Sequence, residues 1–145
     1  MFTEIKGLKT EYQILGEGNI PVLLLHGWAA SFDTYGGIIS GLFDRCKFYA
    51  VNFPGCGQSE TMDEPWDTDD YCDFVLEFIS KMQIDNPIVI GHSHGGRVTM
   101  KLVADGRLNP PKIVLLDAAG LIPKKSFKQK FRAKSFKFPE PHKTL

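Results

Sequence analysis

The sequence is short of cysteine, with only Cys46, Cys56 and Cys72 among its 145 residues. Their number is odd and their spacing is not that of a zinc site, so the sequence indicates neither a disulfide framework nor a cysteine-based metal centre. We therefore expect no metal and no other cofactor. A reducing, cytoplasmic setting is the expected localisation.

Long apolar runs are also missing. No stretch approaches the roughly 18 apolar residues that a membrane-spanning helix needs. Residues 1–9 lack the apolar core and small-residue cleavage site of a secretory leader. We expect neither secretion nor a membrane partner.

Net charge is zero, because 17 basic residues balance 17 acidic ones. The two signs are unevenly distributed: residues 1–120 hold 9 basic and 16 acidic residues, whereas residues 121–145 hold 8 basic and 1 acidic. A basic tail can indicate nucleic acid or anionic lipid as a partner. Four phenylalanines alternate with these charges, however, and favour a helix with one solvated face and one apolar face. We therefore expect no nucleic-acid partner.

What the chain does contain is an alternation of short apolar runs with longer helical patterns, which is typical of a sheet covered by helices. Strands are predicted over residues 10–15, 21–25, 47–53, 88–90 and 112–116. The expected order is β-β-β-α-β-α-β-α-β. The predicted fold class is α/β, with a mostly parallel, doubly wound sheet of about six strands.

Three helices are expected between these strands. Apolar residues recur at helical spacing from Tyr71 to Met82, with Asp67 or Thr68 placed to cap the N-terminus. Residues 97–104 predict a helix that Gly106 ends. Residues 31–43 predict another, although three glycines in that range lower its helix propensity.

The strongest chemical motif is Gly91-His92-Ser93-His94-Gly95-Gly96, which follows a predicted strand and precedes a predicted helix. In this context G-x-S-x-G indicates a nucleophile elbow, a strained turn that presents the serine hydroxyl above the sheet. The alternatives are a plain strand-to-helix turn or a phosphate-binding glycine loop. No lysine follows as in a P-loop, and the spacing is not G-x-G-x-x-G.

Two further loops follow predicted strands. His26-Gly27-Trp28 comes after residues 21–25, where an acyl-transfer enzyme places one backbone N–H donor for the oxyanion; the second donor follows the nucleophile. Here these would be the N–H groups of Trp28 and His94, although His26 can also be read as a buried, hydrogen-bonded imidazole. The loop from Asn52 to Ser59 is interpreted as mainly structural, and nothing beside Cys56 in the sequence would lower its pKa.

Taken in order, these three motifs resemble the α/β-hydrolase superfamily over roughly residues 10–122. The resemblance implies a cofactor-independent hydrolase of esters or related acyl substrates, with a Ser-His-Asp triad and a helical cap after the sixth strand. Serine at position 93, where haloalkane dehalogenases and epoxide hydrolases have aspartate, argues against those branches. The family commonly has aspartate where this sequence has Asn52.

The resemblance also implies parts that we expect to be missing. Residues 1–122 match the N-terminal part of the hydrolase core, and residues 123–145 match the start of a cap helix, before the triad histidine. Among the histidines, only His142 is left as a general base, and it would have to fold back to reach Ser93. Asp117, after the last predicted strand, is either the triad acid or a turn residue.

We therefore predict a serine hydrolase of a small acyl substrate that is weak or inactive as this chain, because a serine without its base is a poor nucleophile. The alternative is a non-catalytic binding or interaction module on the same scaffold. The strand over 112–116 is expected to be an unpaired apolar edge through which chains dimerise or aggregate.

Overall fold

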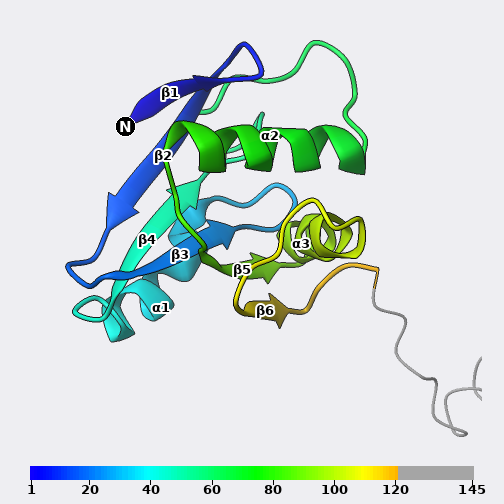
Figure 1. Ribbon diagram of the computed structural model, residues 1–145. Coiled ribbons are helices and arrows are strands. Elements are labelled where there is room, and N and C mark those ends of the chain that lie inside the picture. Colours follow the sequence, from blue (N-terminus) through cyan, green and yellow to red (C-terminus); the bar gives the residue numbers. More distant parts are fainter. Residues whose placement is uncertain (121–145) are drawn as a thin grey trace, which may run out of the picture.

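The computed structural model describes residues 1–120, and within them six strands form one twisted sheet (Figure 1). The strands are β1 (Phe2–Ile5), β2 (Leu8–Leu15), β3 (Ile20–Leu25), β4 (Cys46–Val51), β5 (Ile88–His92) and β6 (Ile113–Leu116). Their order across the sheet is β1-β2-β4-β3-β5-β6. The strands β4, β3, β5 and β6 run parallel, and β1 and β2 add an antiparallel edge. The predicted fold class is confirmed.

The helices are α1 (Gly36–Gly41), α2 (Thr68–Lys81) and α3 (His94–Ala104), with a 3-10 turn at Phe32–Tyr35. Asp67 caps α2 as predicted: its carboxylate accepts the N–H groups of Asp69 and Asp70. The helix predicted over 31–43 is confirmed over residues 32–41, but its first turn is 3-10 and it ends earlier than predicted. The α1 part is short because Gly36, Gly37 and Gly41 weaken its helix propensity.

The expected order of strands and helices is confirmed. Its first strand, for which the sequence pattern indicates no range, forms a hairpin with β2 through Lys6 and Gly7, whose φ angles of 51° and 74° are those of a tight hairpin turn. The helix α3 begins at His94 rather than at 97, immediately after Ser93. The predicted cap segment, 123–145, lies outside the described residues.

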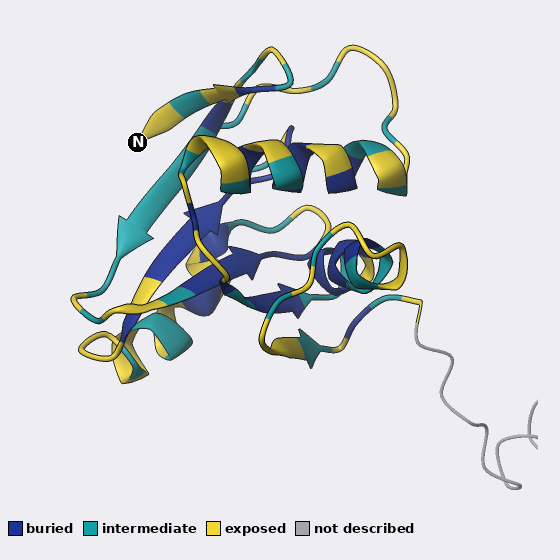
Figure 2. Cartoon of the chain, viewed as in Figure 1, coloured by how far each residue is buried: buried dark blue, intermediate teal, exposed yellow. Residues whose placement is uncertain are grey.

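The core has two layers, one on each face of the sheet (Figure 2). Alternate residues of β3 separate them: Leu23 and Leu25 pack with α2 and α3 on one face, and Val22 and Leu24 pack with the 3-10 turn on the other. Strands buried on both faces read as continuous apolar runs, which is why residues 21–25 were recognisable in the sequence.

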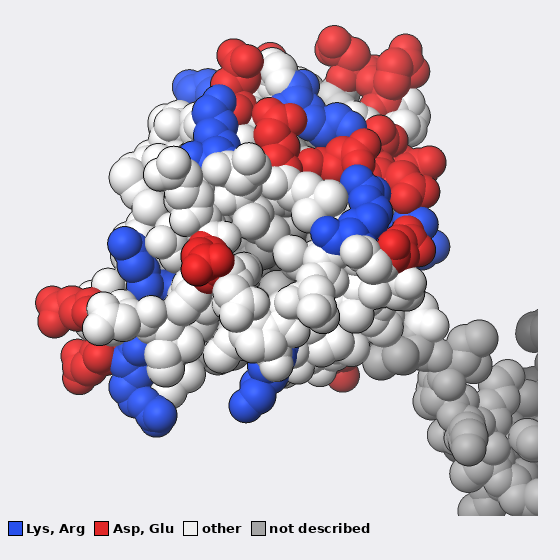
Figure 3. Space-filling view, viewed as in Figure 1, with Lys and Arg blue, Asp and Glu red and all other residues white. Residues whose placement is uncertain are grey.

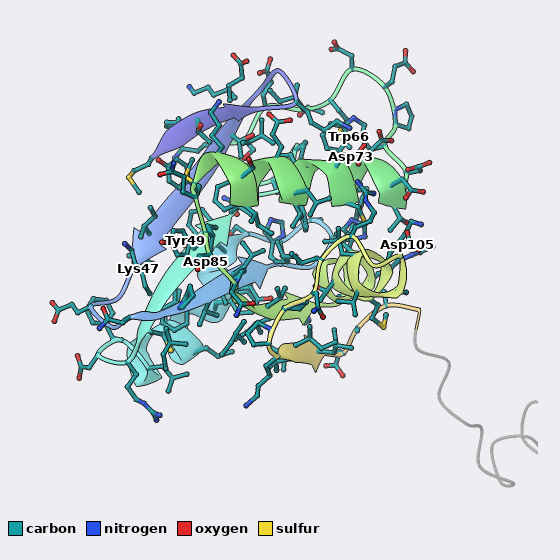
Figure 4. All side chains as sticks on the ribbon, viewed as in Figure 1. Lys47, Tyr49, Trp66, Asp73, Asp85 and Asp105 are labelled. Carbon is teal, nitrogen blue, oxygen red and sulfur yellow. The ribbon has the colours of Figure 1, made fainter. Side chains whose placement is uncertain are left out.

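Charged side chains link α2 to α3. Acidic and basic groups gather over α2 and the loop leading to it (Figure 3). Lys101 of α3 lies 3.0 Å from Asp69 and 2.8 Å from Asp105, and Arg107 pairs with Asp73. Figure 4 shows Asp73 on α2 and Asp105 at the end of α3. These pairs are exposed, so they help to orient the helices but add little stability.

Within residues 1–120, β6 pairs only with β5, and Ile113 and Val114 are each 36% exposed. An apolar strand edge is a template for pairing with another chain. We expect the 145-residue chain to self-associate in light scattering, and Val114→Lys to reduce the association whereas Val114→Thr leaves it. A wild-type chain that stays monomeric would contradict this.

Candidate active site

The candidate site lies where three parallel strands end at one edge of the sheet. The strand β3 lies between β4 and β5 in the sheet. The chain therefore passes from β3 to β4 on one side and then crosses back to β5 on the other side. In open α/β sheets, ligands bind at such a switch point, outside the carboxyl ends of the strands. The loops that follow β3, β4 and β5 are the three that the sequence motifs single out.

Ser93 occupies the turn between β5 and α3 with φ 47° and ψ −108°. A non-glycine residue with this φ is strained, and the strain is held by hydrogen bonds on either side. The Ser93 N–H donates to the Leu116 carbonyl (2.9 Å), and the Ser93 carbonyl accepts from Ala119 (2.9 Å) and Arg97 (3.1 Å). The Ser93 side chain makes no capping hydrogen bond to α3. Its hydroxyl is therefore not occupied in holding the helix terminus.

The glycines of the motif allow α3 to start against β3. Gly95 is buried, and its N–H donates to the His26 carbonyl at 3.0 Å. A Cβ at Gly95 would overlap the backbone carbonyl group of Leu25. Gly91 and Gly96 are buried in the same way, at the end of β5 and in the first turn of α3.

The loop after β3 is fixed by the His26 imidazole, which is fully buried. The Nδ1 atom lies 2.7 Å from the Gly27 carbonyl oxygen, and Nε2 accepts the Phe53 N–H at 3.0 Å. This pattern requires the proton on Nδ1. Burial lowers the pKa of His26, so the ring is neutral near pH 7. Both ring nitrogens are used, which assigns His26 to structure.

Gly27 brings this loop against the elbow. A Cβ at Gly27 would lie 2.8 Å from His92 Nδ1 and 3.2 Å from Ser93 Cβ. The next residue, Trp28, is 70% exposed, and its ring packs edge-on against the His94 ring at 5.6 Å. Within residues 1–120, the backbone N–H groups of Trp28 and His94 have no backbone acceptor. The loop that carries Trp28 therefore lies against the elbow, and the role of the Trp28 and His94 N–H groups as oxyanion donors stays a prediction.

The loop after β4 is tied to β2 and to the 3-10 turn. Asn52 is 1% exposed; its Oδ1 accepts the Phe32 N–H at 2.8 Å, and its Nδ2 donates to Glu11 Oε2 at 2.8 Å. Glu11 was not identified in the sequence. It comes 41 residues before its partner, on a strand whose pattern carries no chemical motif.

A pocket of about 260 Å³ opens beside these loops. Its walls come from the loops after β3 and β4, the loop before α2, α2 itself and the start of α3: Gly27, Trp28, Ala29, Phe53, Pro54, Gly55, Cys56, Thr61, Met62, Tyr71 and His94. The helical spacing of Tyr71 predicts only a core position on α2. It is buried, but its ring also packs against His94 at 4.6 Å and faces the pocket.

The titratable groups of the pocket are uncharged near pH 7. Burial raises the pKa of the Cys56 thiol and of the Tyr71 hydroxyl. Burial also lowers the pKa of His94, and the nearby Arg97 charge acts in the same direction. No Asp, Glu, Lys or Arg contributes to the pocket wall among the described residues.

The two predicted triad partners of Ser93 have different outcomes. Asp117 is exposed at the end of β6 with φ 44°, between Leu116 and Ala119, both of which bond to the Ser93 backbone. Asp117 therefore lies in a strained turn whose flanking residues bind the elbow, and its role as the triad acid stays a prediction. His142 lies outside the described residues.

The chain matches the model of the alpha/beta hydrolase fold over residues 20–140. The chain belongs to the α/β-hydrolase family. A soluble epoxide hydrolase of Corynebacterium sp. is 31% identical to it over 113 residues, which cover 78% of this chain and 39% of that protein.

Two solved α/β-hydrolase structures are similar to this chain. An esterase of Exiguobacterium antarcticum has 26% identity and a TM-score of 0.75, over 82% of this chain and 45% of that one. The epoxide hydrolase CorEH has 30% identity and a TM-score of 0.76, over 88% and 45%. The chain spans less than half the length of each of these hydrolases.

No three His, Cys, Asp or Glu side chains within residues 1–120 come together in a way that could hold a metal ion. No helix there has the length and apolar character to cross a bilayer.

Proposed function

We propose that the protein is a serine hydrolase of a carboxylic ester or related acyl substrate, with Ser93 as its nucleophile. The observation that carries this proposal is the strained Ser93 backbone at the end of β5, held against the Gly27-Trp28 loop at the switch point of the sheet. The N-terminus of α3 adds positive potential beside the hydroxyl.

A hydroxyl nucleophile selects the substrate class by its chemistry. Attack of Ser93 Oγ on an acyl carbon gives an ester of the enzyme, which water can hydrolyse. Attack on an epoxide would give an ether, which water does not cleave under these conditions. Although epoxide hydrolases are among the relatives, the residue at position 93 supports acyl transfer.

The proposed reaction has two stages. Ser93 Oγ forms a bond to the carbonyl carbon while its proton passes to a general base, and the carbonyl oxygen becomes an oxyanion held by the N–H groups of Trp28 and His94. The intermediate collapses, the alcohol leaves with the proton from the base, and water then releases the acid by the same route. We propose that His142 acts as the base in this chain, which leaves acylation measurable although weak, and that Asp117 is the carboxylate that orients it.

The pocket supports an uncharged, apolar acyl group. Its aromatic walls and neutral titratable groups offer no partner for a carboxylate, which would lose its hydration there without compensation. A cavity of about 150 Å³ accommodates benzene, so 260 Å³ has room for a phenyl ring with a short linker or for a medium-length alkyl chain.

Fluorophosphonate labelling tests the proposal. We expect intact-mass and peptide analysis to find the adduct on Ser93, lost in Ser93→Ala and retained in Ser40→Ala, which removes an exposed serine of α1. Of two p-nitrophenyl esters with the same leaving group, the neutral hexanoate should acylate the chain at least about tenfold faster than the anionic succinate.

Two results would contradict parts of this proposal. A chain whose Ser93 is no more reactive than its other serines would contradict the hydrolase proposal and favour the non-catalytic binding module. Labelling of Ser93 with a preference for succinate would keep the nucleophile but contradict the assignment of the acyl group.

A further inference from the structure

One buried polar residue holds the loop that carries Trp28. The Asn52 side chain accepts the Phe32 N–H, and the N–H of the next residue, Phe53, donates to His26. Residues 52 and 53 therefore bind the two ends of the segment 26–32. Trp28 lies within that segment, so the position of its N–H depends on this attachment.

Asn52 is itself held by Glu11. Glu11 Oε2 accepts the Asn52 Nδ2 at 2.8 Å and also the Gln58 N–H at 2.7 Å. The backbones are joined as well, because the Asn52 N–H donates to the Glu11 carbonyl at 2.9 Å. Ser59 completes the connection: its hydroxyl donates to the Asn52 carbonyl and accepts the Glu11 N–H, both at 2.9 Å.

Gly57 leaves room for the contact between Glu11 and Asn52. Gly57, with φ 53°, passes so close to it that a Cβ would overlap both the Asn52 amide nitrogen and the Glu11 carboxylate oxygen. Any other residue at 57 would displace one member of the pair. The packing around the contact is therefore as specific as the hydrogen bonds.

We propose that Glu11 and Asn52 are positioning residues that set the place of the Trp28 N–H through Phe32. Their pairing requires a carboxylate at 11 to face a neutral amide at 52. The amide is required at 52 because it must accept from Phe32 on one side and donate to Glu11 on the other. An aspartate would still accept from Phe32, but it would bring a second carboxylate against Glu11 Oε2. Like charges at that distance separate unless one takes up a proton.

The inference rests on the proposed function for its kinetic readout, and four chains test it: wild type, Asn52→Asp, Glu11→Gln and the double variant. We expect Asn52→Asp to slow fluorophosphonate labelling of Ser93 by at least about tenfold. Glu11→Gln should cost less than about threefold, because one amide oxygen can accept both donors that Oε2 accepts. The double variant should recover most of the rate.

A second readout separates positioning from general stability and does not need a reactive serine. In Asn52→Asp we expect faster hydrogen exchange at the Phe32 and Phe53 amides, which are hydrogen-bonded in this connection, with recovery in the double variant, while amides of α2 stay protected. Asn109→Asp is the matched control, since it adds the same charge at an exposed loop position.

The outcomes distinguish the two proposals. Asn52→Asp could cause the same loss of labelling rate and of exchange protection in the Glu11→Gln background as in the wild-type background. That result would contradict the proposed pairing of Glu11 with Asn52. Recovery of Phe32 protection in a set of chains that never label Ser93 would support the pair and count against the hydrolase proposal.

Discussion

Replacement of Ser93 by glycine is expected to abolish fluorophosphonate labelling and to raise the free energy of unfolding by about 1 kcal/mol. Ser93 adopts φ 47°, which costs a non-glycine residue about 1 to 3 kcal/mol, whereas glycine adopts it freely. Part of the gain is offset because glycine makes the unfolded chain more flexible. The loss of the hydroxyl should lower acylation by at least about a thousandfold.

Ser93→Ala is the matched control for this prediction. Alanine also removes the nucleophile but keeps a Cβ, and with it the backbone strain. Urea unfolding should therefore rank Ser93→Gly above Ser93→Ala and the wild type. If Ser93→Gly had no higher free energy of unfolding than Ser93→Ala, the positive φ of Ser93 would not destabilise the fold. The comparison measures how much stability the fold gives up in order to present the hydroxyl.

The elbow could be predicted from sequence because every part of it is local. A strand, the G-x-S-x-G spacing and a helix stand next to one another between residues 87 and 104, and no distant residue is needed to recognise them. The same holds for Asp67, whose capping partners are two and three residues away. Local motifs of this kind can be recognised in a sequence without any knowledge of the packing.

The Glu11–Asn52 contact could not be predicted in that way. Glu11 lies on a strand between ordinary polar and apolar residues, and its partner is brought to it only by the pairing of β2 with β4. Tyr71 shows the same limit. Its helical spacing correctly indicates a core position, but the pocket beside it exists only because the loops after β3 and β4 meet there.

The helix expected over 31–43 differs from the prediction in its form and its bounds, because tertiary contacts compete there with helix propensity. Ser31 caps the 3-10 turn by accepting the Asp33 N–H, and Phe32 and Tyr35 are buried, with the Tyr35 hydroxyl donating to the Leu25 carbonyl at 2.8 Å. Tertiary contacts fix this stretch at its start, and the glycines after it leave too little propensity to extend the helix.

Gly95→Ala is expected to be strongly disruptive, lowering the free energy of unfolding by about 3 kcal/mol. The added Cβ would overlap the Leu25 carbonyl group and lie 2.8 Å from the His26 carbonyl oxygen. Because these are backbone atoms at the end of β3 and just after it, no side-chain rotation can relieve the overlap. The start of α3 must move away from the loop, and Ser93 and His94 with it.

Gly37→Ala is the control that shows whether the loss of stability is specific to position 95 or follows from any glycine-to-alanine change. Gly37 is an exposed residue of α1 with nothing near its added Cβ, so alanine should leave stability unchanged or raise it by up to about 1 kcal/mol. Thermal unfolding and fluorophosphonate labelling of both variants separate the two cases. Loss of labelling in Gly95→Ala at a temperature where the chain remains folded would show that the reactive geometry depends on the contact between α3 and β3. An unchanged labelling rate would contradict the role given to that contact.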